Sequence, residues 1–597
     1  MVQVRPGTAA RVRQWMTGLP GAGGVTFSSS PDLLIVQVPA SALQTIAQNR
    51  DVVRMSSNAP VQGLDDGRMS RLGQNTLLGT EGLLATRGNS PRPYRSLPYS
   101  GNGVTVALID SGFTPSRDLN NAVFFDFTKG GVQSVPTDAY GHGTHIAGLI
   151  GSEGDISDGQ YQGLAPDVRY VVLKVLDESG AGLTSNVIDA INFAVKNKKI
   201  FGIDIINLSL GHPIYEPAAS DPLVRVVENA AAAGIVVVAS AGNFGGDPET
   251  HVPGYAGITS PGNAPNALTI GAIDTIDSNG RGDDVVAWYS SRGPTWYDGF
   301  QKPDLVAPGS KLVSNTSVSS TLYKTYPGGV VTTFDKPLLR LSGTSMSAGV
   351  VSGVVALMLQ ANRTNYPGAT LTPNAVKAIL QYTAIQMPHY DALTQGAGSL
   401  NALGAITLAA SIDSSRKSGS WWLGTGVTPS TTIDGRTLAW GQGVIWGDKL
   451  LGGDSVFKNA AAWGQGVIWG DGVIWGDGVI WGDSTVWGGN QSTWGAGVIW
   501  GDGLIGQTQS SGVIWGDGVI WGDLSAQGVI WGDLSAQGVI WGDSASQGVI
   551  WGDSLRVSQG PPPTVGELHI ANWELAESTA RRAPHVGRGR NAFRNRR

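Results

Sequence analysis

The stretch Leu341-Ser-Gly-Thr-Ser-Met-Ser-Ala-Gly-Val350 runs directly into an apolar segment, Val351 to Leu359. Small polar residues flanked by glycine therefore stand where a long apolar helix is expected to begin. Ser345 would lie in the first turn, where backbone N–H groups lack intrahelical acceptors and the helix dipole is positive. This setting suits a nucleophile whose reaction generates an oxyanion, but Gly-Thr-Ser before a helix is equally an ordinary N-cap. The rest of the chain has to decide between the two.

Composition narrows the class of protein. A chain of 597 residues is too long for one hydrophobic core, so about two to four domains are expected. The absence of cysteine excludes disulfides, thiolate metal sites and cysteine nucleophiles. A formal net charge of −6 with 14% charged residues gives no indication of a nucleic-acid partner. We expect no transmembrane segment, because no uninterrupted apolar run reaches the roughly 18 residues that a spanning helix needs.

The first hundred residues predict a small domain and a connection. Residues 1–62 alternate short apolar runs with helix-length segments, a pattern typical of an α+β domain. Strands are expected at Val2 to Val4, Leu33 to Val38 and Val52 to Met55, and helices after Thr8 and from Ser41 to Gln48. Residues 63–100 mix Gly, Arg and Pro throughout and predict an exposed connection.

From residue 101 to 410, short β-branched runs alternate with segments of helix length. Strands are expected at Val104 to Ile109, Val168 to Leu173, Ile203 to Leu208, Ile235 to Ala239 and Leu268 to Ile270, and helices at Gly143 to Leu149, Thr184 to Lys196 and Pro222 to Ala233. This alternation predicts an α/β fold, a mostly parallel sheet with helices on both faces. In such sheets, sites form at the carboxyl ends of the strands.

Polar residues stand at those strand ends. Asp110 follows the first strand, Asn243 follows the strand that ends at Ala239, and His142 opens a helical segment between two glycines. Each alone is typical of a turn or loop. Together with Ser345 they supply the roles of acyl transfer: a nucleophile, a general base, an aspartate that orients the imidazole and an amide donor to the oxyanion. A His-x-x-His metal site at His142 and His145 is the alternative, but no matching carboxylate is evident, so we expect His145 to be structural.

Seven motifs in order resemble the subtilisin-like serine peptidases, over roughly residues 100–410. They are Ala107-Leu-Ile-Asp-Ser-Gly112, Gly141-His-Gly-Thr-His-Ile-Ala-Gly148, Ile206-Asn-Leu-Ser-Leu-Gly211, Ala239-Ser-Ala-Gly-Asn243, Ser290-Ser-Arg-Gly-Pro-Thr295, Lys302-Pro-Asp-Leu-Val-Ala-Pro-Gly309 and Gly343-Thr-Ser-Met-Ser347. The resemblance implies a serine endopeptidase acting on polypeptide substrates, with Asp110, His142 and Ser345 as its catalytic residues and Asn243 at the oxyanion. It implies no cofactor for the chemistry.

The resemblance also implies where the substrate binds. In this family an extended peptide is added as a strand between two backbone edges. The matching residues here are Gly180, Ala181 and Gly182 on one edge, Ser209, Leu210 and Gly211 on the other, and Ala241 and Gly242 along the pocket for the residue before the scissile bond. Small residues at the edges would keep the backbone accessible to the peptide.

Two positions depart from the family pattern. Gly349 stands where the family usually has a proline four residues after the nucleophile, which predicts a less rigid first turn. The calcium loop of the family is also altered. Asp118, Asp155 and Asp158, with Glu153, are candidate ligands for a structural calcium ion, and a solvated acidic loop is the alternative reading.

Residues 1–62 resemble the family's propeptide, which assists folding and then inhibits the enzyme until it is cut off. The resemblance implies a zymogen inhibited by its own propeptide, and a secreted or cell-surface location, although no signal peptide is visible in this chain.

A hexamer repeat follows at residues 411–560. Perfect copies of Gly-Val-Ile-Trp-Gly-Asp begin at Gly443, Gly466, Gly472, Gly478, Gly497, Gly512, Gly518, Gly528, Gly538 and Gly548. Even spacings of six and ten keep one strand face throughout, which favours a β-solenoid or hairpin array that could self-associate, with a low-complexity spacer as the alternative. Residues 561–597 are basic toward their end, and we expect them to form a disordered tail. An alternative function for the whole chain is a repeat-based surface or adhesion protein whose protease domain only processes itself.

Overall fold

The computed structural model describes residues 1–63, 98–413 except 277 and 279, 427–441, and a series of short strands at 84–95 and 485–558. The chain divides into two compact units, Met1–Gly470 and Asp471–Arg597. The two predicted stretches 63–100 and 561–597 lie almost wholly outside the described residues.

The first residues form a four-stranded antiparallel sheet with two helices. The strands are β1 (Val2–Val4), β2 (Val25–Phe27), β3 (Leu33–Val36) and β4 (Val52–Met55), in the order β2-β3-β1-β4, and the helices are α1 (Ala9–Thr17) and α2 (Ala40–Ala47). Val12 and Met16 of α1 and Ile46 of α2 are buried against Leu34. This layer therefore has an apolar core of its own.

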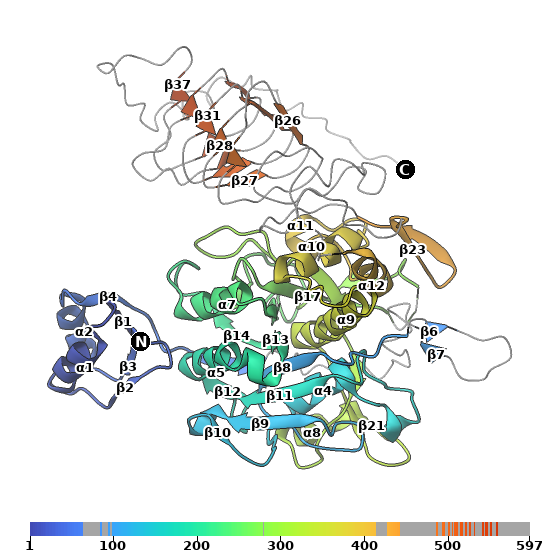
Figure 1. Ribbon diagram of the computed structural model, residues 1–597, viewed down its shortest axis with the longest axis horizontal. Coiled ribbons are helices and arrows are strands. Elements are labelled where there is room, and N and C mark those ends of the chain that lie inside the picture. The colour runs from blue at the N-terminus through green and yellow to red at the C-terminus, as the bar shows by residue number, and fades with distance from the viewer. Residues whose placement is uncertain are drawn as a thin grey trace, which may run out of the picture. The chain divides into compact units, whose positions relative to one another are not determined.

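A nine-stranded sheet organises residues 98–413 (Figure 1). Its central strands pair in parallel in the order β9 (Ala122–Asp126), β11 (Arg169–Lys174), β8 (Thr105–Asp110), β13 (Ile203–Leu208), β15 (Val236–Ser240) and β17 (Leu268–Asp274). β19 (Leu305–Pro308) also pairs in parallel with β17, whereas β10 (Val132–Gln133) and β18 (Val285–Val286) add antiparallel edges. The predicted α/β fold with a mostly parallel sheet is confirmed.

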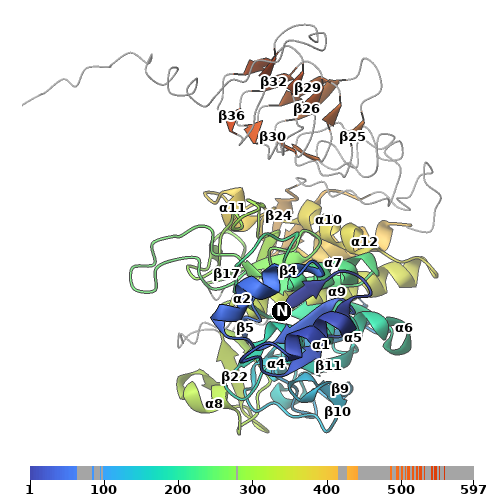
Figure 2. The same ribbon diagram turned by 90° about the vertical axis from the view of Figure 1, so that its left-hand side faces the viewer.

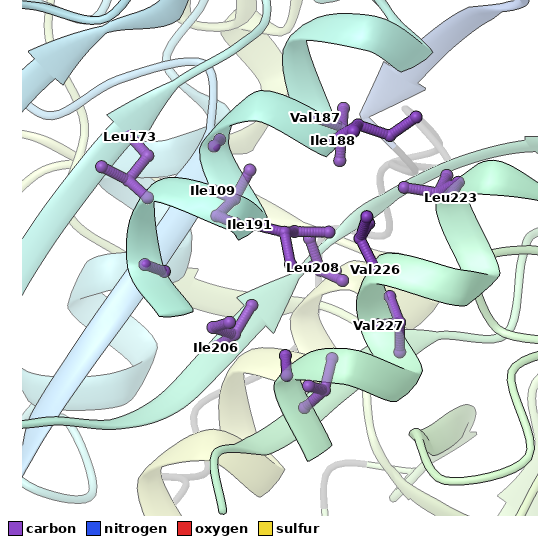
Figure 3. Close-up of a cluster of buried hydrophobic side chains, with 14 of the residues drawn as sticks. Ile109, Leu173, Val187, Ile188, Ile191, Ile206, Leu208, Leu223, Val226 and Val227 are labelled. Atoms are coloured by element: carbon purple, nitrogen blue, oxygen red, sulfur yellow. The ribbon is translucent and has the colours of Figure 1, made fainter. Parts of the chain in front are cut away.

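Helices cover both faces of this sheet. On one face lie α5 (Thr184–Lys196) and α7 (Pro222–Ala232), and Figure 3 shows how their side chains meet those of the strands. Ile191 of α5 and Val227 of α7 belong to the same buried cluster as Ile109 of β8. On the other face α4 (His142–Gly151) crosses α9 (Thr344–Asn365), and Gly143 of α4 packs against the backbone of Gly112 and the side chain of Asp110. Successive residues of β8 thus point to opposite faces: Ile109 packs in the core and Asp110 lies at the candidate site.

The predicted apolar helix after Ser345 is α9, the central helix of the fold. By length and composition it is the one helix among the described residues that could cross a membrane, but 94% of its most apolar window is buried inside this fold. Its apolar character is therefore explained by the surrounding sheet and helices.

Shorter elements complete the first unit. The helices are α6 (Lys198–Phe201), α8 (Thr321–Thr325), α10 (Pro373–Thr383), α11 (Ala392–Gln395) and α12 (Ala402–Ser411), with 3₁₀ turns η1 (Phe127–Lys129), η2 (Asp155–Ser157) and η3 (Pro327–Gly329). The strands are β5 (Pro60–Gly63), β6 (Leu84–Ala85), β7 (Tyr94–Arg95), β12 (Ala181–Leu183), β14 (Leu210–Pro213), β16 (Thr259–Ser260), β20 (Leu312–Ser314), β21 (Val330–Val331) and β22 (Leu338–Leu341).

A hairpin beyond residue 410 packs on the same unit. β23 (Ser430–Ile433) and β24 (Arg436–Ala439) pair in antiparallel register and are followed by Trp440, which is only 4% exposed. The indole of Trp440 lies edge-on to the Tyr382 ring of α10, and its Nε1 donates to Thr431 at 2.7 Å. The folded unit thus extends into the stretch that was expected to hold repeats.

The described strands of the second unit pair in parallel in three sheets. One holds β25 (Thr485–Val486), β28 (Leu504–Ile505), β31 (Ile520–Trp521), β34 (Ile540–Trp541) and β37 (Val557–Ser558), the next β26 (Ser492–Gly495), β29 (Gln507–Ser510), β32 (Leu524–Ala526) and β35 (Ser544–Ser546), and the third β27 (Ile499–Gly501), β30 (Ile514–Gly516), β33 (Ile530–Trp531) and β36 (Ile550–Trp551). Parallel pairing stacks one coil on the next, whereas a hairpin array would pair antiparallel.

Candidate active site

Ser345 is the second residue of α9. Its N–H is therefore among the four at the helix start that have no intrahelical acceptor. The preceding Gly343 has a φ of 156°, which lets the chain turn sharply from β22 into the helix. The Ser345 hydroxyl donates to the carbonyl of Ser209 at 3.0 Å, and the Ser209 hydroxyl donates to the carbonyl of Ser345 at 2.9 Å. This exchange fixes the serine against the end of β13.

His142 and Asp110 form a fully buried pair. Nδ1 of His142 lies 2.8 Å from one carboxylate oxygen of Asp110 and 3.0 Å from the other. Asp110 is the last residue of β8, and His142 is the first residue of α4, so strand and helix hold the two groups face to face. Because a carboxylate accepts, Nδ1 carries the proton, and Nε2 is the nitrogen left to act as a base.

The Asn243 amide is held in one orientation. Its Oδ1 accepts from the N–H of Thr344 at 3.0 Å and from the Thr344 hydroxyl at 2.9 Å. Its Nδ2 is buried and has no acceptor among the described residues. Two donors on the oxygen thus turn the amino group outward as a free donor, which is what an oxyanion site requires. Sequence reasoning missed Thr344, although its place between Gly343 and Ser345 is visible in the motif.

The two expected substrate edges already hold a strand. β5 pairs antiparallel with β12 on one side, where Gly182 is opposite Val61, and with β14 on the other, where Gly211 is opposite Gln62. The N–H of Gly63 donates to the carbonyl of Gly180 at 3.2 Å. A Cβ built on Gly63 would lie 3.5 Å from the His142 ring. The chain's own residues 60–63 therefore occupy the groove between the edges and end beside the histidine.

The glycines of these edges are required by what lies behind them. A Cβ on Gly182 would come within 2.4 Å of the Val175 carbonyl, and one on Gly180, at a φ of 80°, would enter the Tyr140 ring. A Cβ on Gly211 would approach the Ser260 carbonyl to 2.8 Å. The expected reason, that small residues leave the backbone open to the peptide, is therefore incomplete, because larger side chains would also displace the edges themselves.

Ala241 and Gly242 lie where β15 ends. The N–H of Ala241 donates to Ile270 of β17 and the N–H of Thr259 donates to Ala241, so the segment is tied to strands on both sides. Gly242 has a φ of 110°, and a Cβ there would press on the Ser291 hydroxyl at 2.7 Å. This turn places Asn243 at the same end of the sheet as Asp110.

His145 is buried and forms hydrogen bonds with the backbone of β20 and β22. Its Nε2 donates to the carbonyls of Leu339 at 3.0 Å and Leu312 at 3.2 Å. Burial, aided by the neighbouring His142, lowers the pKa of His145 to about 3. A neutral imidazole on two backbone carbonyls fits a structural histidine, and the His-x-x-His metal site gains no ligand here: no cluster of three metal-binding side chains occurs in the described part of the chain.

The candidate calcium ligands do not converge. Asp118 is buried, and its carboxylate accepts from the Ser152 hydroxyl at 2.9 Å, the Ile156 N–H at 3.0 Å and the Asn315 amide at 3.1 Å. Asp155 and Asp158 are exposed, and Asp155 lies 3.6 Å from the Arg117 guanidinium. Hydrogen-bond donors surround the Asp118 oxygens and a guanidinium lies beside Asp155, whereas a calcium ion would need further oxygen ligands at these positions. The residues present therefore do not fit a calcium site at this loop.

Gly349 lies where α9 crosses α4. A Cβ on Gly349 would come within 3.2 Å of the Ile146 side chain. The departure from proline therefore has a packing reason, because the two helices that carry Ser345 and His142 approach each other closely at this point.

These parts define a class of protein: a serine hydrolase on a parallel α/β sheet, with a buried Asp-His pair and an amide donor at the strand ends. The subtilase family model matches residues 101–405. The chain is 37% identical over 312 residues to serine protease AprX of Bacillus subtilis (strain 168). This match covers 51% of this chain and 67% of that protein. It is 33% identical over 304 residues to subtilisin DY of Bacillus licheniformis, covering 51% of this chain and 90% of that protein. The chain belongs to the subtilase family and is a serine-type endopeptidase.

Proposed function

We propose that the chain hydrolyses peptide bonds through an acyl-enzyme on Ser345 and is made as a zymogen. The observation that carries the proposal is the strand β5, which joins both edges of the groove and ends beside His142. A peptide bound in the same way would present its next carbonyl to Ser345, whose hydroxyl reaches the Ser209 carbonyl in that groove.

In this mechanism His142 Nε2 takes the proton of Ser345 as the hydroxyl oxygen attacks the carbonyl carbon of the substrate. Asp110 holds the Nδ1–H and stabilises the imidazolium that forms. The oxyanion accepts from Nδ2 of Asn243 and the N–H of Ser345. The imidazolium then gives its proton to the leaving amine, and water hydrolyses the acyl-enzyme by the reverse roles.

A fluorophosphonate probe tests the nucleophile. The wild-type chain should be labelled, and Ser345→Ala should abolish labelling. Ser347→Ala is the matched control, because Ser347 is buried two residues further along the same helix and donates to the Ala307 carbonyl instead; it should keep the label. A folded wild-type protein that takes no label would refute the proposal.

The zymogen part of the proposal rests on the register of β5. Gly63 is opposite Leu210 and Gln62 is opposite Gly211, so β5 runs antiparallel to this edge and its described part ends one residue short of the level of Ser209. The carbonyl of Ser209 is the group that Ser345 touches. We therefore propose that self-cleavage takes place one residue beyond β5, at the bond between Leu64 and Asp65, and that the N-terminal product inhibits the enzyme.

A second attachment supports an inhibitor that can leave. The Asp189 carboxylate of α5 accepts from the hydroxyls of Ser28 and Ser29 and from the Ser29 N–H, at 2.6–2.9 Å. Figure 2 shows this N-terminal layer in front of α5. A cavity of about 810 Å³ remains between the turn at Ser29 and helices α5 and α7. A polar and incompletely packed contact favours release once the covalent link is cut.

Sequencing the mature N-terminus tests this assignment. The wild-type enzyme should begin at Asp65, and Ser345→Ala should stay full length at the same expression level. A mature form cut at a different bond by the enzyme itself would contradict the register argument, and a Ser345→Ala chain that is still cut would point to another protease.

The location and the repeats belong to the proposal as well. We assign the enzyme to the cell surface or the medium, with the repeat unit as an accessory that self-associates. The alternative, a repeat-based surface or adhesion protein whose protease only processes itself, draws on the parallel stacking of the repeat strands. Digestion of casein by the mature form separates them: a general protease degrades it, whereas a self-processing enzyme cleaves only its own chain.

A further inference from the structure

Asp138 is a buried carboxylate four residues before His142, with no role in the chemistry described so far. It is 4% exposed and accepts four hydrogen bonds. Oδ1 accepts from the Ser111 hydroxyl at 2.8 Å and the Gly141 N–H at 2.7 Å. Oδ2 accepts from the N–H and the hydroxyl of Thr144, at 2.8 and 2.6 Å. All of these donors lie within two residues of Asp110 or His142 in the chain.

Two of these bonds cap the helix that carries His142. The N-cap position of α4 is Gly141, which has no side chain to satisfy the free N–H groups of the first turn. Asp138 supplies the missing acceptor from outside the helix. Because a negative charge at a helix N-terminus is also favoured by the dipole, Asp138 fixes where α4 begins and hence where the imidazole of its first residue stands.

The other bonds tie the cap to the strand that carries Asp110. The Ser111 hydroxyl accepts from the Gly143 N–H at 2.9 Å while it donates to Asp138, and the Ser111 N–H donates to Asp110 at 2.6 Å. The Thr144 hydroxyl likewise accepts from the Thr114 N–H at 3.0 Å. Each hydroxyl thus accepts one hydrogen bond from a backbone N–H and donates one to Asp138, so the direction of every bond is set.

We propose that Asp138 is the positioning residue of this enzyme: through Ser111 it locks the end of β8 to the start of α4, and so fixes Asp110 against His142. The proposal rests on the roles proposed above for that pair. Misplacing a catalytic group by about 1 Å costs on the order of 10²-fold in rate, so a carboxylate that touches no substrate can still govern turnover.

The test is Asp138→Asn in the full chain, with turnover expressed per active site titrated by the fluorophosphonate probe. Asparagine has nearly the same size as aspartate, but its NH₂ group would face groups that already donate hydrogen bonds to this position. The NH₂ group would therefore find no acceptor there. We expect kcat to fall about 10–100-fold with KM within about threefold, because the four hydrogen bonds of Asp138 go to Ser111, Gly141 and Thr144 and not to the substrate edges β12 and β14. The acid limb of kcat/KM against pH should move to lower pH, since a looser Asp110 stabilises the imidazolium less.

Two further variants keep the test sharp. Ser111→Ala cuts the link to β8 but leaves the cap of α4, so it should show the same pattern more weakly, and the double variant should be less than additive. Asp126→Asn is the control: Asp126 is also buried and caps a turn through Thr128 at 2.5–3.0 Å, on β9, which is separated from β8 by β11. It should lose stability without changing kcat per titrated site.

The outcomes separate the two proposals. A wild-type chain that does not label refutes the proposed nucleophile. If the wild type labels normally and Asp138→Asn shows unchanged kcat per site and an unchanged acid limb, Asp138 is only structural and the positioning role is wrong. If Asp138→Asn does not fold, Ser111→Ala decides in the same way.

Discussion

Asn243 depends on its neighbour Thr344 for its orientation, and this makes a prediction at the scale of one residue. Asn243→Ala removes the amide donor and should lower kcat about 10²–10³-fold, as loss of one oxyanion donor does in enzymes of this kind. KM for a peptide substrate should change little, because the amide acts only where charge develops. Thr344→Val tests the support: Val lacks the hydroxyl that donates to Oδ1, and a smaller loss of kcat is expected. Equal loss of kcat and binding would argue against an oxyanion role.

His145 makes the fold sensitive to acid. Its pKa in the folded protein is lowered to about 3 from an ordinary value of 6.5 by burial and by His142. Below pH 6.5 His145 therefore binds a proton in the unfolded chain but stays neutral in the folded chain. Its contribution to stability is full above pH 6.5 and falls as the pH drops toward 3. The contribution of this group should change by about 1.4 kcal/mol per pH unit within that window.

Denaturant unfolding of the inactive Ser345→Ala protein at pH 7, 6, 5 and 4 measures this effect. His145→Gln in the same background keeps an N–H donor but cannot be protonated, so its stability should fall less steeply with acid. Identical slopes for the two proteins would show that another group causes the acid loss.

At the scale of elements, the substrate edges are built with no room behind them. Gly182→Ala would push a methyl group to within 2.4 Å of the Val175 carbonyl, so the backbone of β12 or of Val175 would have to shift. We expect a loss of about 1–3 kcal/mol in stability, slower self-cleavage and a higher KM. Gly328→Ala is the matched control, because a Cβ there has nothing within 4 Å. A Gly182→Ala enzyme with normal KM and stability would show that the edge can yield.

At the scale of the whole molecule, the hairpin with Trp440 sets where the catalytic unit ends. A chain that stops after Gly441 retains Trp440 against Tyr382, and its kcat/KM should match the full chain. A chain that stops after Ser411 loses a buried tryptophan and uncovers α10 and α12, which should cost about 3–5 kcal/mol. Thermal unfolding and peptide hydrolysis of the two truncations measure both effects. Equal stability would mean that the hairpin is dispensable.

Much of this protein was determined by the sequence alone. The alternation of apolar strands and helices predicted the parallel sheet, and the helix Thr184–Lys196 and the strand Ile203–Leu208 have the predicted bounds, because periodicity is a local property of the chain. The four residues proposed for catalysis were also visible, since each stands at the end of an element whose pattern is local. The misfit of the acidic loop after α4 to calcium was not visible, because a carboxylate in the sequence does not reveal which donors surround it.

Tertiary structure alone decided the rest. Residues 60–63 carry no strong strand pattern, and they form a strand only because two edges, one near residue 182 and one near residue 211, stand on either side of them. The same holds for Asp138, which in sequence is one more loop aspartate, and for Gly349, whose reason is the crossing of two helices. These roles depend on contacts between segments distant in the chain, and such contacts leave no local pattern in the residues that make them. Ser345 combines both cases: the sequence placed it at the start of an apolar helix, and the fold brought Ser209, the end of β5 and Asn243 to that start.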